Sequence, residues 1–206
     1  MTKFQRHQVN WKSCTACSLC EGRRNVVLFR GQIPCDVLFI GEAPGASEDV
    51  IGSPFTGPAG HLLDDIVSKA MDKAGHEHDT GAQRPDGGWY SEWRPADLRV
   101  GYTNLISCIP LDESGSKVKE PPEESIKACE DRLEEILLIC KPKLVVCVGK
   151  LPEKWLPKLF GSAQHVNDNM VTITHPAAIL RMEGFQQGLA TQQVVVTLRD
   201  AFAGLE

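Results

Sequence analysis

The run Asp36-Val-Leu-Phe-Ile40 is continuously apolar after its first residue and ends at Gly41. A short apolar run without polar alternation is typical of a strand that is buried on both faces of a parallel sheet. The run Lys143-Leu-Val-Val-Cys-Val148, which ends at Gly149, has the same pattern. Two weaker runs complete a set of four predicted strands, Leu98 to Asn104 and Met170 to Thr174.

Helical patterns lie between these runs. Gly60 to Lys73 carries apolar residues at 3.6-residue spacing, and a second apolar stripe follows Pro121-Pro122 as far as Cys140. A third helix is expected from about Phe185 to Phe202, although Val194-Val-Val196 could form an edge strand instead. Alternating strands and helices predict an α/β fold, a three-layer α/β/α sandwich with a four-stranded, mainly parallel sheet. A ligand of such a sheet is expected at the carboxyl ends of the strands.

Length and composition indicate one soluble domain. The 206 residues contain no internal repeat and no linker between two apolar halves, so we expect a single domain over residues 1–206, with 75–98 as an inserted surface loop. That loop carries Trp89, Tyr90 and Trp93. A net charge of -5 excludes a global basic field, so any nucleic-acid surface must be local. The polar start and the absence of a long apolar run predict a cytoplasmic protein without a membrane partner.

Eight cysteines need an explanation in a chain that is neither short nor visibly secreted. In a reducing compartment, clustered cysteines hold metal or serve chemistry, and scattered ones are small buried apolar residues. The spacing Cys14-x2-Cys17 lets one loop offer two sulfurs to one metal centre, whereas Cys20 leaves the pairing ambiguous. Cys140 and Cys147 are most simply core residues.

The segment from Gly41 to Gly60 is long for a strand-to-helix connection and rich in glycine and proline. Loops of this length are usually functional or disordered, and the prolines favour a rigid course. Pro58-Ala59 stands where a P-loop needs Lys-Ser/Thr, and no G-x-G-x-x-G is present, so ordinary nucleotide loops are excluded. The residues alone leave a ligand site and a tight structural turn both open.

Four separated blocks resemble family 4 uracil-DNA glycosylases in the family's order. GEAPG-x-x-ED and G-x-PF-x-G-x-AG, within 41–60, resemble the first motif, and Leu62-Leu63-Asp64 follows them. Thr103-Asn-Leu-Ile-Ser-Cys-Ile-Pro110 resembles the second motif, and Thr174-His-Pro-Ala-Ala-Ile-Leu-Arg181 the third. The opening Cys14-x2-Cys17-x-Leu19 also matches. The resemblance covers nearly the whole chain and implies the fold of that family.

The resemblance implies a structural [4Fe-4S] cluster, with residues 1–35 as the cluster-binding N-terminal segment. Its ligands would be Cys14, Cys17, Cys108 and Cys129, with Cys20 as an extra thiol. Cys108 follows a predicted strand, and Cys129 is expected in the second turn of the next helix. Four thiolates could also hold zinc, so the choice of iron and sulfur follows from the resemblance alone.

The resemblance also implies a uracil site. Phe55 would be the stacking platform for a base flipped out of DNA, and the Asn104 amide would match the edge of uracil, with Gly41 and Ala43 beside them. His175 would donate a hydrogen bond to the uracil oxygen next to the broken bond, as a neutral imidazole. Two carboxylates would position water and support the sugar cation, Glu42 and Glu48. Glu48 resembles the family's water-side acid, whereas Glu42 could instead fix the loop by bonding its backbone.

DNA contacts are expected around this site. Backbone amides near Gly57 and Gly60 would hold phosphates, helped by His61. Leu180 would act as a wedge beside the lesion and Arg181 as an anchor. Ala177 departs from the family's usual Ser after His-Pro and removes a hydroxyl that could bind a phosphate.

The expected function is a monomeric uracil-DNA glycosylase that hydrolyses the N-glycosidic bond of uracil in DNA and leaves an abasic site. Two alternatives remain open at this point. One is a catalytically silent nucleic-acid-binding module of the same fold, which the departure at Ala177 and the long 75–98 loop favour. The other is a glycosylase for another deaminated base.

Overall fold

The structure is a computed structural model that describes residues 1–76, 98–160 and 169–205. Its centre is a five-stranded sheet of order β1-β3-β2-β4-β5. Four strands are parallel, and β1 (Arg30–Gly31) pairs antiparallel with β3 at the sheet edge. The parallel strands are β2 (Val37–Gly41), β3 (Val100–Asn104), β4 (Leu144–Val148) and β5 (Met170–Ile173).

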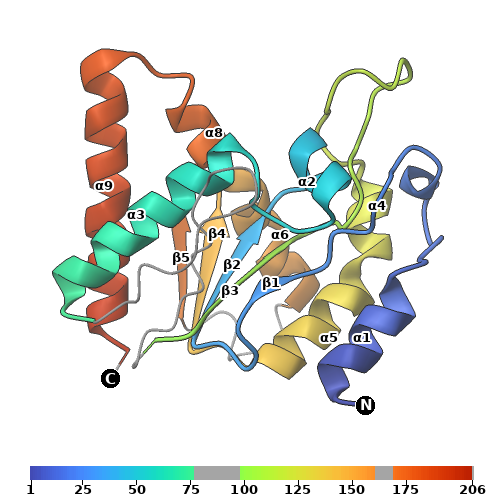
Figure 1. Ribbon diagram of the computed structural model, residues 1–206, viewed down its shortest axis with the longest axis horizontal. Helices are drawn as coiled ribbons and strands as arrows, with labels where there is room; N and C mark the ends of the chain where they lie inside the picture. Colours follow the sequence, from blue (N-terminus) through green and yellow to red (C-terminus); the bar gives the residue numbers. More distant parts are fainter. Residues whose placement is uncertain (77–97, 161–168, 206) are drawn as a thin grey trace.

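Helices cover both faces of the sheet and form three layers (Figure 1). One apolar core lies between the sheet and α3 (Pro58–Ala74), α8 (Pro176–Ile179) and α9 (Gly184–Ala203). A second core lies under α4 (Glu123–Ala128), α5 (Glu130–Cys140) and α6 (Lys150–Phe160), and α1 (Lys3–Trp11) packs against α5. Because both faces are covered, β2, β3 and β4 are buried along their whole length, as the apolar runs of β2 and β4 predicted.

Two sequence predictions about the sheet and its helices need correction. The sheet has five strands and not four, because the short Arg30–Gly31 segment pairs with β3. The stripe after Pro122 is not one helix: it breaks at Cys129, whose φ of -93° and ψ of 0° end α4 and start α5. Cys129 therefore lies at a junction between two helices and not within a second helical turn.

Other elements were predicted with mixed success. Gly60 to Lys73 and Phe185 to Phe202 are confirmed as helices, so the alternative of an edge strand at Val194-Val-Val196 is wrong. Four of the described α-helices were not foreseen: α1, α6 with its internal Pro157, α8, and α2 (Ala46–Ile51), which lies inside the long loop after β2. The predicted surface loop at 75–98, with Trp89, Tyr90 and Trp93, falls almost entirely outside the described residues.

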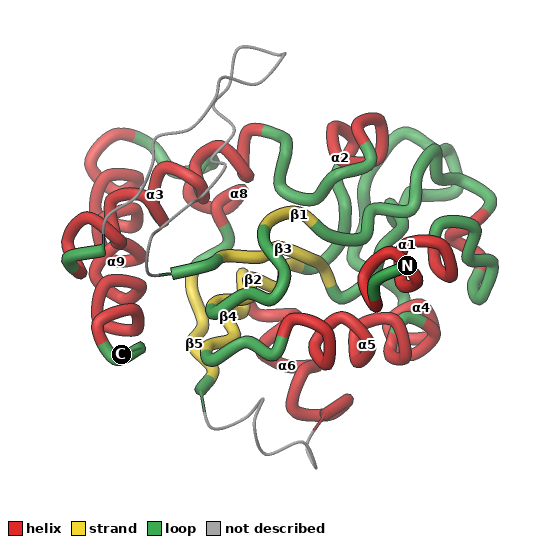
Figure 2. Tube along the Cα trace, turned by 60° about the horizontal axis from the view of Figure 1, so that its bottom comes forward, coloured by secondary structure: helices red, strands yellow, loops and turns green. Residues whose placement is uncertain are grey.

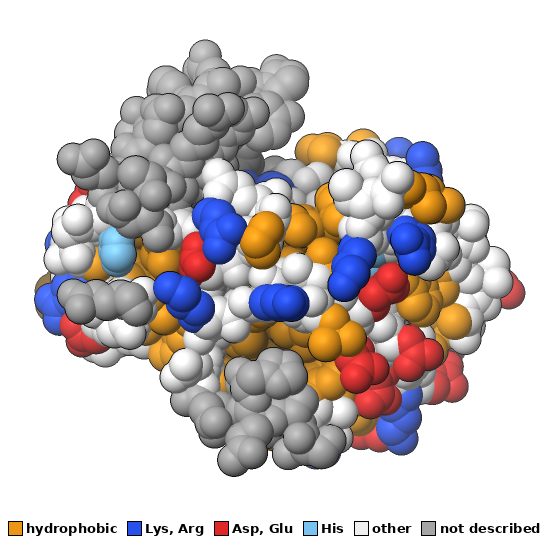
Figure 3. All heavy atoms as spheres, turned by 90° about the horizontal axis from the view of Figure 1, so that it is seen from below, with side chains coloured by type: hydrophobic (Ala, Val, Ile, Leu, Met, Phe, Trp, Pro, Cys, Tyr) orange, Lys and Arg blue, Asp and Glu red, His pale blue; other side chains and the backbone are white. Residues whose placement is uncertain are grey.

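The N-terminus at α1 and the C-terminal end of α9 lie on opposite sides of the sheet (Figure 2). None of the described helices has the length and apolar content needed to cross a bilayer. Seen from the amino-terminal ends of the strands, Lys and Arg side chains lie apart from one another, among acidic, apolar and uncharged groups (Figure 3). The described residues of this face form no continuous basic patch (Figure 3).

Candidate active site

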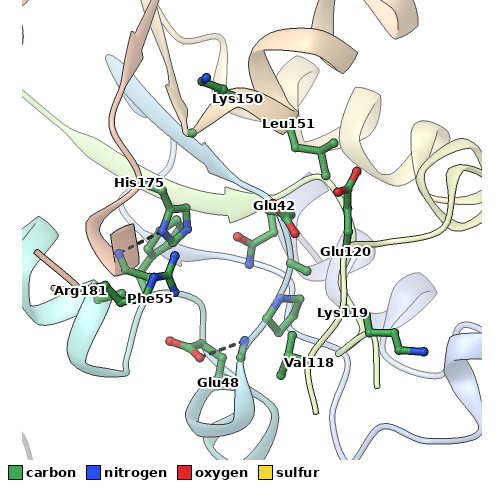
Figure 4. A pocket seen from close by; sticks show the side chains of 18 of the residues that line it. Glu42, Glu48, Phe55, Val118, Lys119, Glu120, Lys150, Leu151, His175 and Arg181 are labelled. Carbon is green, nitrogen blue, oxygen red and sulfur yellow. Dashed lines mark hydrogen bonds between the residues drawn. The ribbon is translucent and has the colours of Figure 1, made fainter. Parts of the chain in front are cut away.

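A cleft of about 710 Å³ opens at the carboxyl ends of the strands, where the segments that follow all four parallel strands meet (Figure 4). This is the edge at which the carboxyl-end rule places a ligand. Eight residues predicted from the sequence line the cleft: Glu42, Ala43, Glu48, Phe55, Gly60, Asn104, His175 and Arg181. Segments that are far apart in the chain therefore meet in one site.

Gly41 explains how an aromatic ring and an amide come to lie together. It ends β2 and pairs in register with Asn104, which ends β3. A Cβ atom on Gly41 would lie 2.4 Å from Asn104 Oδ1 and 2.6 Å from Phe55 Cζ. Both side chains therefore pack directly on the strand end, in space that any larger residue would occupy. The absence of a side chain at Gly41 therefore leaves the space that the Phe55 ring and the Asn104 amide fill.

The Phe55 backbone is bent to deliver its ring to this position. Its φ of 55° is in the left-handed region, which is uncommon for a bulky residue. Gly60 permits the bend, because a Cβ atom there would lie 2.0 Å from the Phe55 carbonyl oxygen. The ring is 6% exposed and packs on Tyr102 at 5.7 Å between centroids. Phe55 is thus a loop anchor as well as a part of the cleft wall.

His175 is held in one orientation and one protonation state. Its Nδ1 accepts a hydrogen bond from the Ala177 amide at 3.1 Å. Burial lowers the pKa of His175 below its ordinary value of 6.5, and Arg181 lowers the pKa further against an opposing effect of Glu48. The imidazole is therefore neutral near pH 7. Because Nδ1 is an acceptor, the ring proton is on Nε2, which can donate.

Glu48 binds the backbone of its own loop. Its Oε1 accepts hydrogen bonds from the amides of Thr56 at 3.1 Å and Gly57 at 2.8 Å, and its Oε2 accepts from Gly45 at 3.1 Å. The sequence had suggested this loop-fixing role for Glu42, and that suggestion is wrong. The Gly57 amide, which was expected to hold a phosphate, donates to Glu48 instead.

The carboxylate of Glu42 lies in the cleft and, unlike that of Glu48, accepts no hydrogen bond from the described backbone amides. Within the described part of the chain, no hydrogen bond to its carboxylate forms. Burial raises the pKa of Glu42 above its ordinary value of 4.5, and the neighbouring Glu120 raises the pKa further. Of the two predicted carboxylates, Glu42 is therefore the one with free lone pairs for water.

The rim of the cleft carries basic side chains that sequence reasoning missed. Lys119, Lys150 and Lys154 line the cleft together with the predicted Arg181. In Figure 4, His175 and Arg181 lie on one side of the cleft, and Lys119 and Glu120 lie on the other. The predicted wedge Leu180 is 42% exposed and does not line the cleft. The missed lysines follow β4 or the second motif, and only their place after a strand could have indicated them.

A second, much smaller cavity brings the predicted ligand cysteines together. It is lined by Cys14, Cys17, Cys108 and Cys129, but not by Cys20. Arg23 donates from Nη1 to Cys108 Sγ at 3.3 Å and from Nη2 to the Cys14 carbonyl at 2.5 Å. Among the described residues, no three His, Cys, Asp or Glu side chains gather around a position for a single metal ion. Four thiols beside cationic groups nevertheless fit an anionic metal–sulfur group chemically.

Cys35, Cys140 and Cys147 do not line this cavity. Cys140 and Cys147 are fully buried in the core under α5 and α6, as predicted. Cys35 is buried in the same core. Buried thiols of this kind act as small apolar residues.

Comparison with known proteins agrees with this arrangement. Residues 29–199 match the model of the uracil DNA glycosylase superfamily. The chain belongs to this superfamily. The matched range includes the cleft-lining loops after β2, β3, β4 and β5, so the predicted family is confirmed.

Relatives of this uracil DNA glycosylase superfamily member are similar along most of its length. It is 30% identical over 199 residues to the type-4 uracil-DNA glycosylase of Pyrobaculum aerophilum, with 87% of each chain covered. It is 28% identical over 184 residues to the type-4 uracil-DNA glycosylase of Archaeoglobus fulgidus, with 82% of this chain and 78% of the relative covered. The crystal structure of SMUG2 from Pedobacter heparinus shares the fold, at a TM-score of 0.56 and 16% identity over 83% of this chain and 76% of that one.

Proposed function

We propose that this protein is a uracil-DNA glycosylase that hydrolyses the N-glycosidic bond of uracil in DNA and leaves an abasic site. The observation that carries the proposal is the joint packing of the Phe55 ring and the Asn104 amide on Gly41, in the cleft that His175 also lines. The relatives named as type-4 uracil-DNA glycosylases support the same substrate.

Binding begins with extrusion of the nucleotide, which costs a few kcal/mol of stacking and pairing. Stacking on the Phe55 ring returns about 1 to 3 kcal/mol. The Asn104 carboxamide offers one acceptor and one donor, which match the donor and acceptor on the edge of uracil. Cytosine presents the opposite edge, so the same amide disfavours the normal base.

Bond cleavage moves negative charge onto the uracil ring and positive charge onto the sugar. The Nε2–H of neutral His175 stabilises the first charge by donating to the uracil oxygen. A preorganised donor of this kind typically contributes about 10²- to 10³-fold in rate. The Glu42 carboxylate orients the attacking water and stabilises the sugar cation, and Glu48 supports the same cation from its fixed loop.

DNA is held by a few positive side chains around the cleft and not by the net charge of the whole protein. Lys119, Lys150, Lys154 and Arg181 around the cleft supply the cations for phosphate contacts. With this few contacts, binding should weaken only moderately as salt rises. We expect the chain to act as a monomer in the cytoplasm.

The four-cysteine cavity would hold a [4Fe-4S] cluster through Cys14, Cys17, Cys108 and Cys129. Four thiolates could also hold zinc. The relatives named type-4 uracil-DNA glycosylases favour the iron-sulfur cluster over zinc. When bound, the cluster supplies a cross-link between the N-terminal segment, the loop after β3 and the α4–α5 junction. Purified protein should be brown and lose its visible absorption with dithionite, whereas zinc protein would be colourless.

The test uses end-labelled oligonucleotides that contain uracil, hypoxanthine or thymine opposite guanine, followed by alkaline cleavage. The proposal predicts strand scission at uracil alone. Scission at hypoxanthine would indicate a glycosylase for another deaminated base, and binding without scission would indicate a silent nucleic-acid-binding module. His175→Ala should abolish most scission. His76→Ala is the matched control, because His76 lies at the end of α3 and contacts the Phe202 carbonyl.

A further inference from the structure

Arg132 lies on α5 between the four-cysteine cavity and the uracil site. Its side chain is completely buried. Nη1 donates to Thr103 Oγ1 at 2.9 Å, and Nη2 donates to the carbonyls of Asn104 at 2.6 Å and Leu105 at 2.7 Å. One guanidinium therefore holds three consecutive residues at the end of β3.

The charge of Arg132 is not balanced by a carboxylate. No ion pair joins it to an acidic side chain in the described segments, and its Nε has no hydrogen-bond partner. It lines the four-cysteine cavity and lies close to Cys14, Cys108 and Cys129. A buried cation without a counter-charge is strongly unfavourable. Thiolates are the groups that can supply the missing negative charge, because metal-bound cysteine is deprotonated.

We propose that Arg132 is a positioning residue that couples the four-cysteine cavity to Asn104. The thiolate site neutralises the buried guanidinium, and the guanidinium in turn fixes the end of β3, which carries the uracil-reading amide. This inference deepens the proposed function and rests on it for the identity of the ligand. The inference concerns the position of the end of β3, so it can be tested without any catalytic assay.

Two backbone hydrogen bonds report on that position. The Leu105 amide donates to the Gly41 carbonyl at 2.8 Å, and the Ile106 amide donates to the Glu42 carbonyl at 3.3 Å. They join the segment that Arg132 holds to the strand end under Phe55 and to Glu42. Any loosening of the Arg132 contacts should open these bonds first.

The experiment is hydrogen exchange measured by mass spectrometry on peptides that cover 103–107, in the metal-loaded full chain. Arg132→Met removes the charge and all three hydrogen bonds at similar length. Arg23→Met is the matched control, because Arg23 also touches the cavity but bonds Cys108 and the Cys14 carbonyl instead of β3. Both variants remove one positive charge beside the cysteines, so both should lower the reduction potential of a cluster.

We expect at least tenfold faster exchange over 103–107 in Arg132→Met and unchanged exchange there in Arg23→Met. The dissociation constant for DNA with a non-hydrolysable uracil nucleotide should rise by about tenfold or more only in Arg132→Met. Unchanged exchange in Arg132→Met, or equal acceleration in both variants, would overturn the inference. If the wild type binds no uracil DNA, the proposed function fails while the exchange result still decides the coupling.

A second variant covers the case in which Arg132→Met does not fold. Arg132→Lys keeps the charge but cannot hold three oxygens with a planar fork. It should leave the reduction potential near that of the wild type and still accelerate exchange over 103–107. In the metal-loaded state, the midpoint of thermal unfolding of Arg132→Lys should lie several degrees below that of the wild type. After the metal is removed by a chelator, the difference between the two proteins should be clearly smaller. Equal falls in the two states would contradict the coupling.

Discussion

The amide of Ala177 donates to Nδ1 of His175 at 3.1 Å, and this bond determines which ring nitrogen carries the proton. A backbone amide can only donate, so Nδ1 must be unprotonated and Nε2 must hold the hydrogen. The lowered pKa of His175 keeps the ring neutral around pH 7. The imidazole can therefore donate a hydrogen bond from Nε2 at a fixed position.

Replacement of His175 should affect the chemical step more than binding. His175→Ala removes the Nε2–H donor, so kcat should fall by about 10²- to 10³-fold while KM changes by only a few fold. Single-turnover excision and a binding titration on the same oligonucleotide separate the two effects. A large rise in KM with unchanged kcat would assign His175 to ground-state binding only.

The acid side of the pH profile should depend on Glu42. Its pKa is raised by burial and by Glu120, so the reactive carboxylate is lost as the pH falls through a value above 4.5. Glu120→Gln removes one cause of the raised pKa, and the acid limb of kcat/KM should move to lower pH. Glu124→Gln on α4 removes the same charge outside the cleft and should leave the limb in place. An unchanged acid limb in Glu120→Gln would show that Glu120 does not act on Glu42.

Gly41→Ala should damage the site without unfolding the protein. The added methyl group would meet Asn104 Oδ1 and the Phe55 ring at less than 3 Å, so both must move. We expect kcat/KM for uracil to fall by about 100-fold or more and the free energy of unfolding to fall by about 1 to 3 kcal/mol. Gly188→Ala is the control, because nothing lies within 4 Å of the new Cβ atom in α9. It should stabilise the helix slightly and leave excision unchanged.

Glu48 should matter for stability as well as for activity. Glu48→Ala leaves the amides of Gly45, Thr56 and Gly57 without their acceptor, so we expect a loss of about 2 to 4 kcal/mol in denaturant unfolding. Glu48→Gln keeps one acceptor oxygen and should lose less. Equal stability of Glu48→Ala and the wild type would show that the loop does not depend on these bonds.

The sequence was sufficient for the sheet and for most of the cleft because both depend on local patterns. Buried parallel strands appear as apolar runs, and residues just after them meet at one edge, which brought Asn104 and His175 together. The antiparallel Arg30–Gly31 strand was missed because two residues carry no periodicity. α6 was missed because its prolines mask a helical pattern.

The roles of the two glutamates could not be read from the sequence. Both lie in the same loop, and only the backbone path decides that Glu48 meets three amides while Glu42 stays free of such bonds. The break at Cys129 also has no local signal, because Ser125 to Cys140 reads as one continuous helical stripe. The sequence also gives no sign that Arg132 is fully buried, since its partners come from β3 and from the cysteines of distant segments.

The most direct test is the rate at which free uracil is released from DNA with a single uracil, under single-turnover conditions, by the wild type and by Asn104→Asp. The account predicts rapid release by the wild type and at least a 100-fold slower release by the variant, because a carboxylate cannot donate to the base. Equal rates for the two proteins, or no release by the wild type, would contradict it.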